Sequence, residues 1–359
     1  MDAPRAEARE AADGILVLGA GPVGCTVALA LHAAGQRVAV QDDSPLRAGF
    51  RPIALSYASR LILERVGAWG RFEATPIETV HVSQQGSFGR TRMEARDAGV
   101  PALGYVVDYG ALTAALRSLV DAASIPRHSA SAASLTVHAE GVTEEAKEKR
   151  YEQDAVVARV AMAVPAGTSA YERFTSEGPL ALLPFAGAYA LVWSTRPDRA
   201  RALADLPEDA FLRRLAEAAG RRLRALSGVA DRAVHPLVLR VRRRRVSPRA
   251  VHIGNAAQSL HPVAGQGLNL GLRDAWDLAR ILRDVKDPGD PAVLARYEAL
   301  RQLDAFATVR VTDAMASAFT GSNPLAGAAR GLALSALDVL PGPRRFFARR
   351  MMFGPSALP

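Results

Sequence analysis

Cysteine and long hydrophobic runs are scarce in this sequence. The single cysteine, Cys25, cannot form an intrachain disulfide, a thiolate metal cluster or a CxxC redox pair. The seven histidines include no HxxxH pair, so we expect no metal site. The longest apolar stretch, 178–193, is interrupted by Pro184 and Gly187 and falls short of the roughly 20 residues that a membrane helix needs. The first residues also lack the order of a secretory signal, and we expect a protein of cytoplasmic type.

Lysine is nearly absent, since only three of the 45 basic residues are lysines, and the net charge is +9. A basic chain can indicate nucleic-acid binding, but no helix-turn-helix, zinc-finger or RNP motif accompanies the charge here. The arginines are spread along the chain except in 240–249, and we attribute their excess to coding bias. We therefore expect no nucleic-acid partner. Hydrophobic residues at 49% and charged residues at 23% are typical of a globular chain with one large domain or two ordinary ones.

The first regular pattern is that of a dinucleotide-binding unit. Ile15 to Leu18 is a short apolar run, which predicts a parallel strand buried on both faces. The glycine-rich turn 19–24 follows, then an apolar helical pattern over 25–34 and a second strand over 37–41 that ends at Asp42. A strand, GxGxxG, helix, strand and acid in this order predict a dinucleotide site rather than an ordinary tight turn.

Each glycine of this turn has its own structural reason. Gly19 would make the tight turn, Gly21 would let the backbone approach a pyrophosphate, and Gly24 would let the helix pack closely on the strand. The helix N-terminus would offer N–H groups to the phosphates. Asp42 would accept hydrogen bonds from a ribose, with Asp43 as the alternative. The binding candidates of this unit are Gly19, Gly21, Pro22, Val23, Gly24 and Asp42.

A second glycine-rich segment follows a predicted strand at 249–253. Here Gly265, Gly267 and Gly271 leave the backbone bare at the start of another helix. Such a start can direct N–H groups and the positive end of the helix dipole at an anionic group, such as the N1–C2 edge of a reduced flavin. The alternative is a glycine-rich loop without a ligand. The binding candidates here are Gly254, Asn255, Pro262, Gly265, Gly267, Leu268 and Asn269.

A resemblance to a known family is carried by the segment 254–275, GNAAQSLHPVAGQGLNLGLRDA. It resembles the second flavin-binding motif of the group A flavoprotein aromatic hydroxylases, and most of all that of their ubiquinone-biosynthesis branch. Asn255 stands where most of the family has an aspartate at the ribityl chain, as it does in the ubiquinone branch. Arg51 resembles the arginine of the family that reaches the cofactor. Further segments resemble the family in the same order, so the resemblance covers nearly the whole chain: 51–55, 104–116, 171–184 and 344–354.

The resemblance implies an α/β fold. A Rossmann-like FAD-binding domain with a doubly wound parallel sheet would be interrupted by a mainly antiparallel β-sheet substrate domain and followed by C-terminal helices. The FAD-binding domain would be discontinuous and comprise 1–75, 103–150 and 249–320. The substrate domain would comprise 76–102 and 151–248, and the C-terminal helical segment 321–359.

The resemblance also implies an FAD-dependent monooxygenase. NAD(P)H would reduce FAD, and the reduced flavin with O₂ would form a C4a-hydroperoxide that hydroxylates a prenylated phenol of ubiquinone biosynthesis. NAD(P)H would bind only transiently, because the chain has a single GxGxxG. Pro262 and His261 would lie near the flavin, where we expect His261 to be structural rather than a catalytic base. Other ubiquinone-biosynthesis proteins, and at most a peripheral contact with the inner membrane, are the further partners implied.

One part of the family pattern is not found in the sequence. The family carries an Ala-Asp-Gly turn, preceded by about two or three strands, between the helix at 112–123 and the substrate sheet. No Ala-Asp-Gly occurs between Ala123 and Tyr151. We therefore expect the strands and the turn to be missing and the pyrophosphate site to be incomplete. Two other functions stay open: a flavin-dependent reductase or dehydrogenase on the same scaffold, and a non-catalytic hydroxylase-like subunit of a quinone-biosynthesis complex.

Two arginine-rich segments have both a structural and a functional interpretation. We expect 240–246 to be a strand end or loop with solvated arginines, and the alternative is attraction of NADPH phosphates or an anionic membrane. The segment 344–352 mixes four arginines with aromatic residues and methionines. We expect it to form a helix that docks on the FAD-binding domain, and the alternative is a basic, apolar entry for a prenylated substrate.

Overall fold

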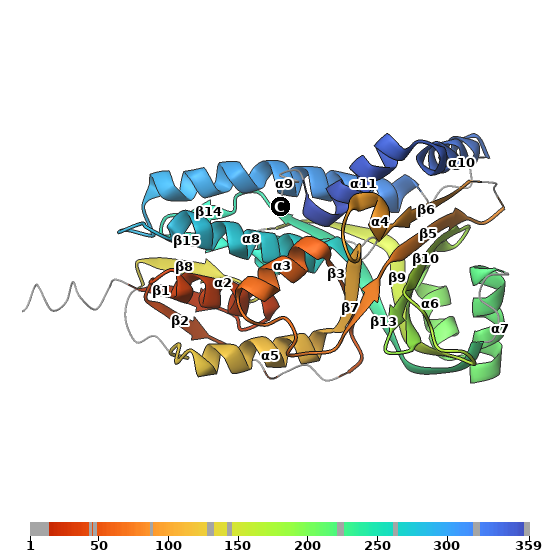
Figure 1. Cartoon of the computed structure of the whole chain (residues 1–359), viewed down its shortest axis with the longest axis horizontal. Coiled ribbons are helices and arrows are strands. Elements are labelled where there is room, and N and C mark those ends of the chain that lie inside the picture. The colour runs from red at the N-terminus through yellow and green to blue at the C-terminus, as the bar shows by residue number, and fades with distance from the viewer. Residues whose placement is uncertain are drawn as a thin grey trace, which may run out of the picture.

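The computed structural model describes residues 14–42, 45, 49–86, 89–127, 133–141, 146–220, 226–260, 265–318 and 324–354. These residues form an elongated α/β molecule, with a mainly parallel sheet towards one end and a large, mainly antiparallel sheet towards the other (Figure 1). A small three-stranded sheet lies between the two.

The parallel sheet begins with the strand that the first apolar run predicts. β1 (Ile15–Leu18) pairs in parallel with β2 (Val38–Gln41) on one side and with β8 (Leu135–His138) on the other. β15 (Ala250–His252) continues the sheet in parallel beyond β8, and β14 (Val246–Ser247) is an antiparallel edge. Segments far apart in the chain therefore bring their carboxyl ends to one edge of this sheet.

Three helices share a core with these strands. α2 (Pro22–Ala33) starts directly after the glycine turn and contacts both α5 (Tyr109–Ala122) and α8 (Gln266–Leu282). α5 begins directly after Asp108, whose carboxylate caps the helix by accepting a hydrogen bond from the Ala111 N–H at 2.9 Å. The helices thus start close to the edge at which the parallel strands end.

The small sheet connects the two ends of the molecule. β3 (Pro52–Ser56), β7 (Gly104–Asp108) and β4 (Ala74–Ile77) are antiparallel, in the order β3-β7-β4. α3 (Tyr57–Arg65) leaves β3 at Ser56, whose hydroxyl oxygen accepts a hydrogen bond from the N–H of the third residue along at 3.2 Å.

The large sheet has the strand order β16-β13-β9-β12-β11-β10-β5-β6. Its neighbouring strands are antiparallel except for the parallel pair β10 and β5. α6 (Pro197–Ala204) and α7 (Glu208–Ala219) pack on it around Trp193 and Phe211. The strands are β5 (Thr79–Gln84), β6 (Arg90–Glu94), β9 (Ala146–Met162), β10 (Ser169–Thr175), β11 (Gly178–Phe185), β12 (Ala188–Thr195), β13 (Leu226–Arg242) and β16 (Gln258–Ser259).

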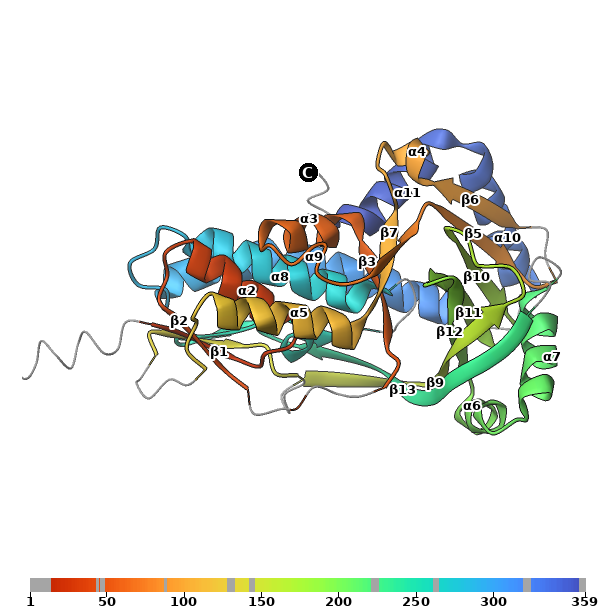
Figure 2. The ribbon, with the colours of Figure 1, turned by 60° about the horizontal axis from the view of Figure 1, so that its bottom comes forward.

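β9 and β13 are each 17 residues long and pair with one another (Figure 2). The first part of β9 is highly charged, yet it forms a strand because Glu148 faces Arg240 of β13 and pairs with it at 2.7 Å. The expectation that all arginines of 240–246 are solvated is therefore wrong for Arg240. Two boundaries of the domain division expected from the sequence, after residues 75 and 150, fall inside β4 and β9.

Helices complete the fold along one side of the molecule (Figures 1 and 2). The helix α11 (Pro341–Phe353) contains the segment 344–352. It contacts α3 and β3, which agrees with the docking expected on the FAD-binding domain, and it also contacts α4. No helix among the described residues is long and apolar enough to cross a membrane. Likewise, no cluster of three or more His, Cys, Asp or Glu within this part of the chain could hold a metal. The remaining helices are α4 (Ala95–Ala98), η1 (Gly254–Ala256), α9 (Pro291–Ala318) and α10 (Pro324–Val339).

Candidate functional site

A cavity of about 1050 Å³ extends from the carboxyl ends of β1, β2 and β8, past β3, to the large sheet. One end is lined by the two glycine-rich segments. The other end is lined by side chains of β5, β10 and β11 and of the helices α10 and α11. A ligand held at the glycine turns can therefore reach the large sheet without leaving the cavity.

The turn 19–24 has the geometry that its glycines predict. Gly19 has φ +98°, and a Cβ on it would lie 2.6 Å from the Cα of Glu140. A Cβ on Gly24 would lie 1.9 Å from the Gly19 carbonyl oxygen, so α2 can approach β1 this closely only with glycine there. Gly21 instead borders the cavity, and a Cβ on it would have one neighbour, at 3.4 Å. The start of α2 is thus open to an anionic ligand.

Asp42 lies directly after β2 and lines the cavity, where the sequence predicts a ribose contact. The Arg117 guanidinium of α5 forms an ion pair with it and donates a hydrogen bond to the Ala20 carbonyl oxygen at 2.8 Å. Arg117 therefore fixes the carboxylate and adds a positive charge beside the turn. The alternative ribose ligand, Asp43, lies outside the described residues.

The second helix start, at α8, also faces the cavity. α8 begins after Gly265, which has φ +59°, and a Cβ on Gly267 would meet nothing within 4 Å. The N–H groups of this first turn can therefore approach a ligand. Asn269 positions the turn rather than offering its amide to a ligand, because that amide makes hydrogen bonds of 2.6–3.0 Å to Ser56, Ser59, Ala54 and Gly265.

A buried ion network holds the second glycine-rich segment onto α8 and α9. The Asp274 carboxylate accepts hydrogen bonds from the Gly254 N–H at 3.2 Å and from Arg301 at 2.8 Å. Burial alone would lower the pKa of Arg301, but the carboxylates of Asp274 and Asp304 raise it, so the guanidinium stays charged. Arg245 is also buried here, so the expectation of solvation is wrong for it too. The network comprises Arg245, Arg273, Arg301, Asp274, Asp277 and Asp304.

The central turn that we expected to be missing is present in altered form. β8 lies between β1 and β15, and the three residues that follow it, Ala139-Glu140-Gly141, line the cavity beside Gly19. They stand where the family pattern has Ala-Asp-Gly, with an acid one CH₂ longer. No strand occurs among the described residues between α5 and β8, which agrees with the expected loss of the strands. The expected loss of the turn is wrong. The sequence signal that could have located this turn is the apolar alternation in Leu135 to His138, which is followed by an acid and a glycine.

Two stacked histidines lie beside this turn. The rings of His138 and His252, at the ends of β8 and β15, have centroids 4.4 Å apart and an interplanar angle of 6°. His138 Nδ1 lies 2.8 Å from the Glu140 carboxylate. Burial alone would raise the pKa of Glu140, but the hydrogen bond to His138 and backbone N–H groups lower it. Burial first, then Arg242 and His138, lower the pKa of His252 to about 4, so its ring is neutral at pH 7.

Most of the predicted binding residues meet at the cavity. Gly24 lies behind them against Gly19, and His261 and Pro262 lie outside the described residues. Cys25 is buried, and burial raises the pKa of its thiol to about 12, which agrees with a packing role. The residues that line the cavity are Gly19, Gly21, Pro22, Val23, Asp42, Arg51, Gly254, Asn255, Gly265, Gly267, Leu268 and Asn269.

The polar residues of this cavity that sequence reasoning missed include Tyr109, Arg117 and Glu140. The Arg51 guanidinium lies 4.3 Å from the ring centroid of Tyr109, so Arg51, which the sequence predicted, forms a cation–π contact with Tyr109, which it did not. Tyr109 and Arg117 belong to α5, whose helical pattern the sequence showed without a motif at either position. Only the assembled sheet brings that helix to the glycine turn.

The far end of the cavity is mainly apolar. It is lined by Ile77, Val80, Val82, Met93, Leu183, Leu334, Leu337, Phe347, Met351 and Met352. An apolar wall of this kind suits a hydrophobic ligand, whereas the helix starts at the other end suit an anionic one.

Comparison with known proteins shows the family to which this chain belongs. The family model of an FAD-binding domain matches residues 127–312. Ubiquinone hydroxylase UbiL of Rhodospirillum rubrum is 32% identical over 382 residues, which cover 94% of this chain and 89% of that protein. The 3-demethoxyubiquinol 3-hydroxylase of Escherichia coli is 28% identical and covers 90% of this chain and 94% of its own length.

The fold is found in solved structures as well. The p-nitrophenol 4-monooxygenase PnpA of Pseudomonas putida superposes with a TM-score of 0.75 at 17% identity, covering 94% of this chain and 96% of that one. PqsL of Pseudomonas aeruginosa, a probable FAD-dependent monooxygenase, gives a TM-score of 0.70 at 19% identity, over 90% and 99% of the two chains. The predicted combination of a parallel FAD-binding sheet with an antiparallel sheet is therefore confirmed.

Proposed function

The chain belongs to the FAD-dependent aromatic hydroxylases, in the branch of the ubiquinone hydroxylases, and from this premise we propose that it hydroxylates a phenol ring carrying a prenyl tail. It is an FAD-dependent monooxygenase. The observation that carries the proposal is the continuous cavity, which is polar at the glycine turns and apolar at the large sheet. Relatives named as ubiquinone and demethoxyubiquinol hydroxylases support a substrate of this chemistry.

The polar end of the cavity fits FAD. The starts of α2 and α8 face it at Gly21 and Gly267, where the absence of a Cβ leaves room for the pyrophosphate and for the N1–C2 edge of the ring. The pair of Asp42 and Arg117 would hold a ribose. When bound, FAD would take two electrons from transiently bound NAD(P)H and, with O₂, supply the oxygen atom for the substrate.

The apolar end fits the prenylated ring. Pockets for one small ligand measure about 300–1,000 Å³, so the volume of 1050 Å³ has room for the flavin end of the cofactor and a second ligand. Each buried CH₂ contributes about 0.8 kcal/mol, so the tail would provide much of the binding free energy. The same wall would exclude water from the reacting atoms.

The reaction itself can be tested on the FAD-loaded protein. NAD(P)H oxidation and O₂ consumption are measured with a short-chain prenylphenol, and incorporation of ¹⁸O into the product is measured by mass spectrometry. We expect one labelled oxygen atom per NAD(P)H. Reduction of the prenyl double bond without oxygen incorporation would instead support a reductase, and failure to retain FAD would support a non-catalytic subunit.

The tail site has a matched pair of variants on one helix. Leu337 of α10 lines the cavity, whereas Leu332 on the same helix is exposed. Leu337→Glu should raise the KM for the prenylphenol at least about tenfold, because a buried charge would replace part of the apolar wall. Leu332→Glu should leave the KM unchanged. Equal effects of the two variants would contradict this placement of the tail.

A further inference from the structure

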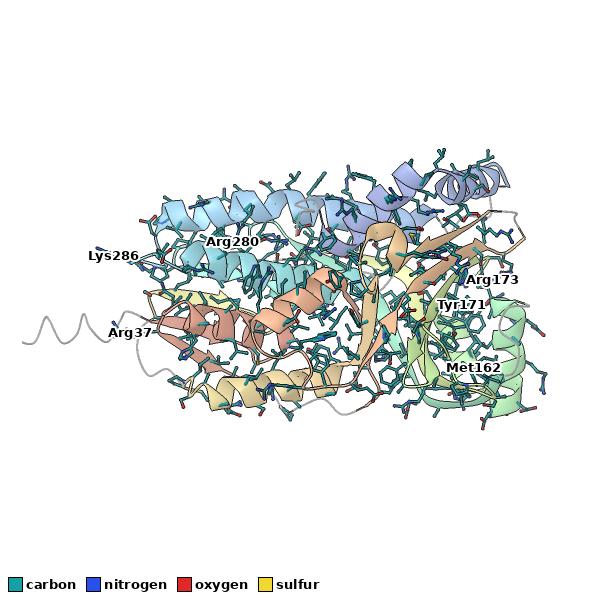
Figure 3. The ribbon with its side chains drawn as sticks, viewed as in Figure 1. Arg37, Met162, Tyr171, Arg173, Arg280 and Lys286 are labelled. Atoms are coloured by element: carbon teal, nitrogen blue, oxygen red, sulfur yellow. The ribbon has the colours of Figure 1, made fainter. Side chains whose placement is uncertain are left out.

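One carboxylic acid, Glu172, lies in the apolar part of the cavity wall. It belongs to β10, in which the alternate residues Ala170, Glu172 and Phe174 share one face and line the cavity, which Arg173 also borders. The residues between them lie towards α7 (Figure 3): Tyr171 packs into the core beneath α6 and α7, and the Arg173 guanidinium lies against the residue that ends α7. The pleat of the strand therefore places the Glu172 carboxyl and the Arg173 guanidinium on opposite faces, although both residues border the cavity.

The neighbours of Glu172 on the sheet are apolar. It stands opposite Val82 of β5 and Ala181 of β11, and Val192 of β12 stands opposite Ala181. These residues line the cavity with it. Within the described part of the chain, no group donates a hydrogen bond to the Glu172 carboxyl and no cation pairs with it.

A carboxyl in this position lacks a partner that a ligand could supply. Burial raises the pKa of Glu172, because the ionised form loses hydration without gaining a cation. Glu172 is half-buried and lines the cavity, so an apolar residue would form this part of the wall without the cost of desolvating a carboxyl. A carboxyl with a raised pKa is also suited to take up a proton and return it.

We propose that Glu172 accepts a hydrogen bond from the ring hydroxyl of the phenol and removes its proton during hydroxylation. This assignment rests on the proposed function and adds a catalytic residue to it. The O–H bond of the phenol breaks, its electron pair stays on the oxygen as phenolate, and the proton forms an O–H bond on Glu172.

The proton balance closes over one turnover. The phenolate increases the electron density of the ring carbon that receives oxygen. O₂ supplies that atom, and NAD(P)H supplies the two electrons that reduce the second oxygen atom to water. The carbon then loses its proton to solvent as the ring regains aromaticity, and Glu172 returns its own proton to the phenolate oxygen.

The first test compares Glu172→Gln with the wild-type holoenzyme. Glu172→Gln keeps the shape of the side chain but cannot take a proton, so the rate of product formation should fall about 100-fold or more, the scale of general acid–base catalysis. The flavin-to-protein ratio should not change. The residual rate should rise about tenfold per pH unit as the substrate ionises in solution, because free phenols have a pKa of about 10. Glu172→Asp should restore part of the rate at neutral pH.

A matched control is Glu177→Gln, which changes a glutamate after β10 that pairs with Arg199 outside the cavity. This variant should keep the wild-type rate and pH profile. If Glu172→Gln also kept both, the assignment would be overturned and Glu172 would be structural.

A binding experiment separates this proposal from the proposed function. A prenylphenol and its methyl ether are titrated into the holoenzyme, and their dissociation constants are read from flavin fluorescence. The phenol should bind about 10- to 100-fold more tightly than the ether, as expected for a hydrogen bond to a charged group. The preference should vanish in Glu172→Met. If Glu172→Met loses the preference for the phenol but the wild type hydroxylates no prenylphenol, the proposed function is wrong and Glu172 remains the phenol ligand. Equal binding of the phenol and the ether by the wild type would overturn the assignment of Glu172.

Discussion

Lowering the pH from 7.5 to 5 should destabilise this protein through one buried histidine. His252 stacks on His138 and is 5% exposed, and burial, Arg242 and His138 lower its pKa from 6.5 to about 4. The folded state therefore keeps the ring neutral at a pH at which the unfolded chain protonates it. Since the unfolded state binds more protons in this window, stability must fall as the pH falls.

The size of the effect follows from the two pKa values. At pH 5 the unfolded histidine is almost fully protonated and the folded one almost fully neutral, so the free energy of unfolding decreases by about 2 kcal/mol relative to pH 7.5. Stability from this site is complete above a pH of 6.5, decreases between 6.5 and about 4, and decreases no further below that. A loss of this size is a substantial part of the 5–15 kcal/mol of a typical domain, roughly a fifth.

Urea unfolding followed by tryptophan fluorescence at pH 7.5, 6 and 5 measures this loss. The control is His252→Phe, which keeps a ring against His138 but removes the titrating group. The wild type should lose about 2 kcal/mol more than this variant between pH 7.5 and 5. Equal losses in the two proteins would refute the reasoning, because another group would then carry the pH dependence.

Three further outcomes can be measured at the cofactor site. Gly21→Val and Gly267→Val should each abolish flavin retention, since both positions border open cavity, and a normal flavin-to-protein ratio in either would contradict that placement. Asp42→Ala should weaken FAD binding by about 1–3 kcal/mol in a fluorescence titration, while the amount of product formed per bound flavin stays unchanged. A dissociation constant equal to that of the wild type would show that Asp42 does not bind the cofactor. Asp274→Asn should lower the free energy of unfolding by about 3–5 kcal/mol, because it removes the carboxylate that the buried Arg245 and Arg301 share, and a urea midpoint at the wild-type value would show that the network contributes little.

Sequence patterns within a short segment correctly predicted those elements whose contacts are formed by residues close together in the chain. The strand at Ile15 to Leu18 is recovered with its exact bounds, because a short run buried on both faces needs only apolar residues. The turn that follows is likewise determined within six residues. The helix at α8 was predicted for the same reason, since its glycines and its apolar periodicity lie in one continuous segment.

Features that depend on distant partners were missed. The charged start of β9 has no strand pattern of its own in the sequence, and it pairs with β13 through Glu148 and Arg240, which stands 92 positions later. Glu140 was overlooked because its role depends on β8 lying between β1 and β15, and not on the residue type expected in that turn. Arg245 was expected to be solvated, and only Asp274, from a different element, explains its burial.

The shared length of β9 and β13 has a consequence for how this enzyme can be divided. Each strand runs for 17 residues, or about 56 Å at roughly 3.3 Å per residue, and pairs with the other along most of it. A fragment that ended within either strand would break this pairing and leave an unpaired strand edge, which promotes aggregation. The strands of the parallel sheet and of the large sheet also alternate along the chain, so no single cut separates the two sheets. Limited proteolysis should therefore fail to release either end as a stable folded piece, and the chain should be expressed and evolve as one inseparable unit.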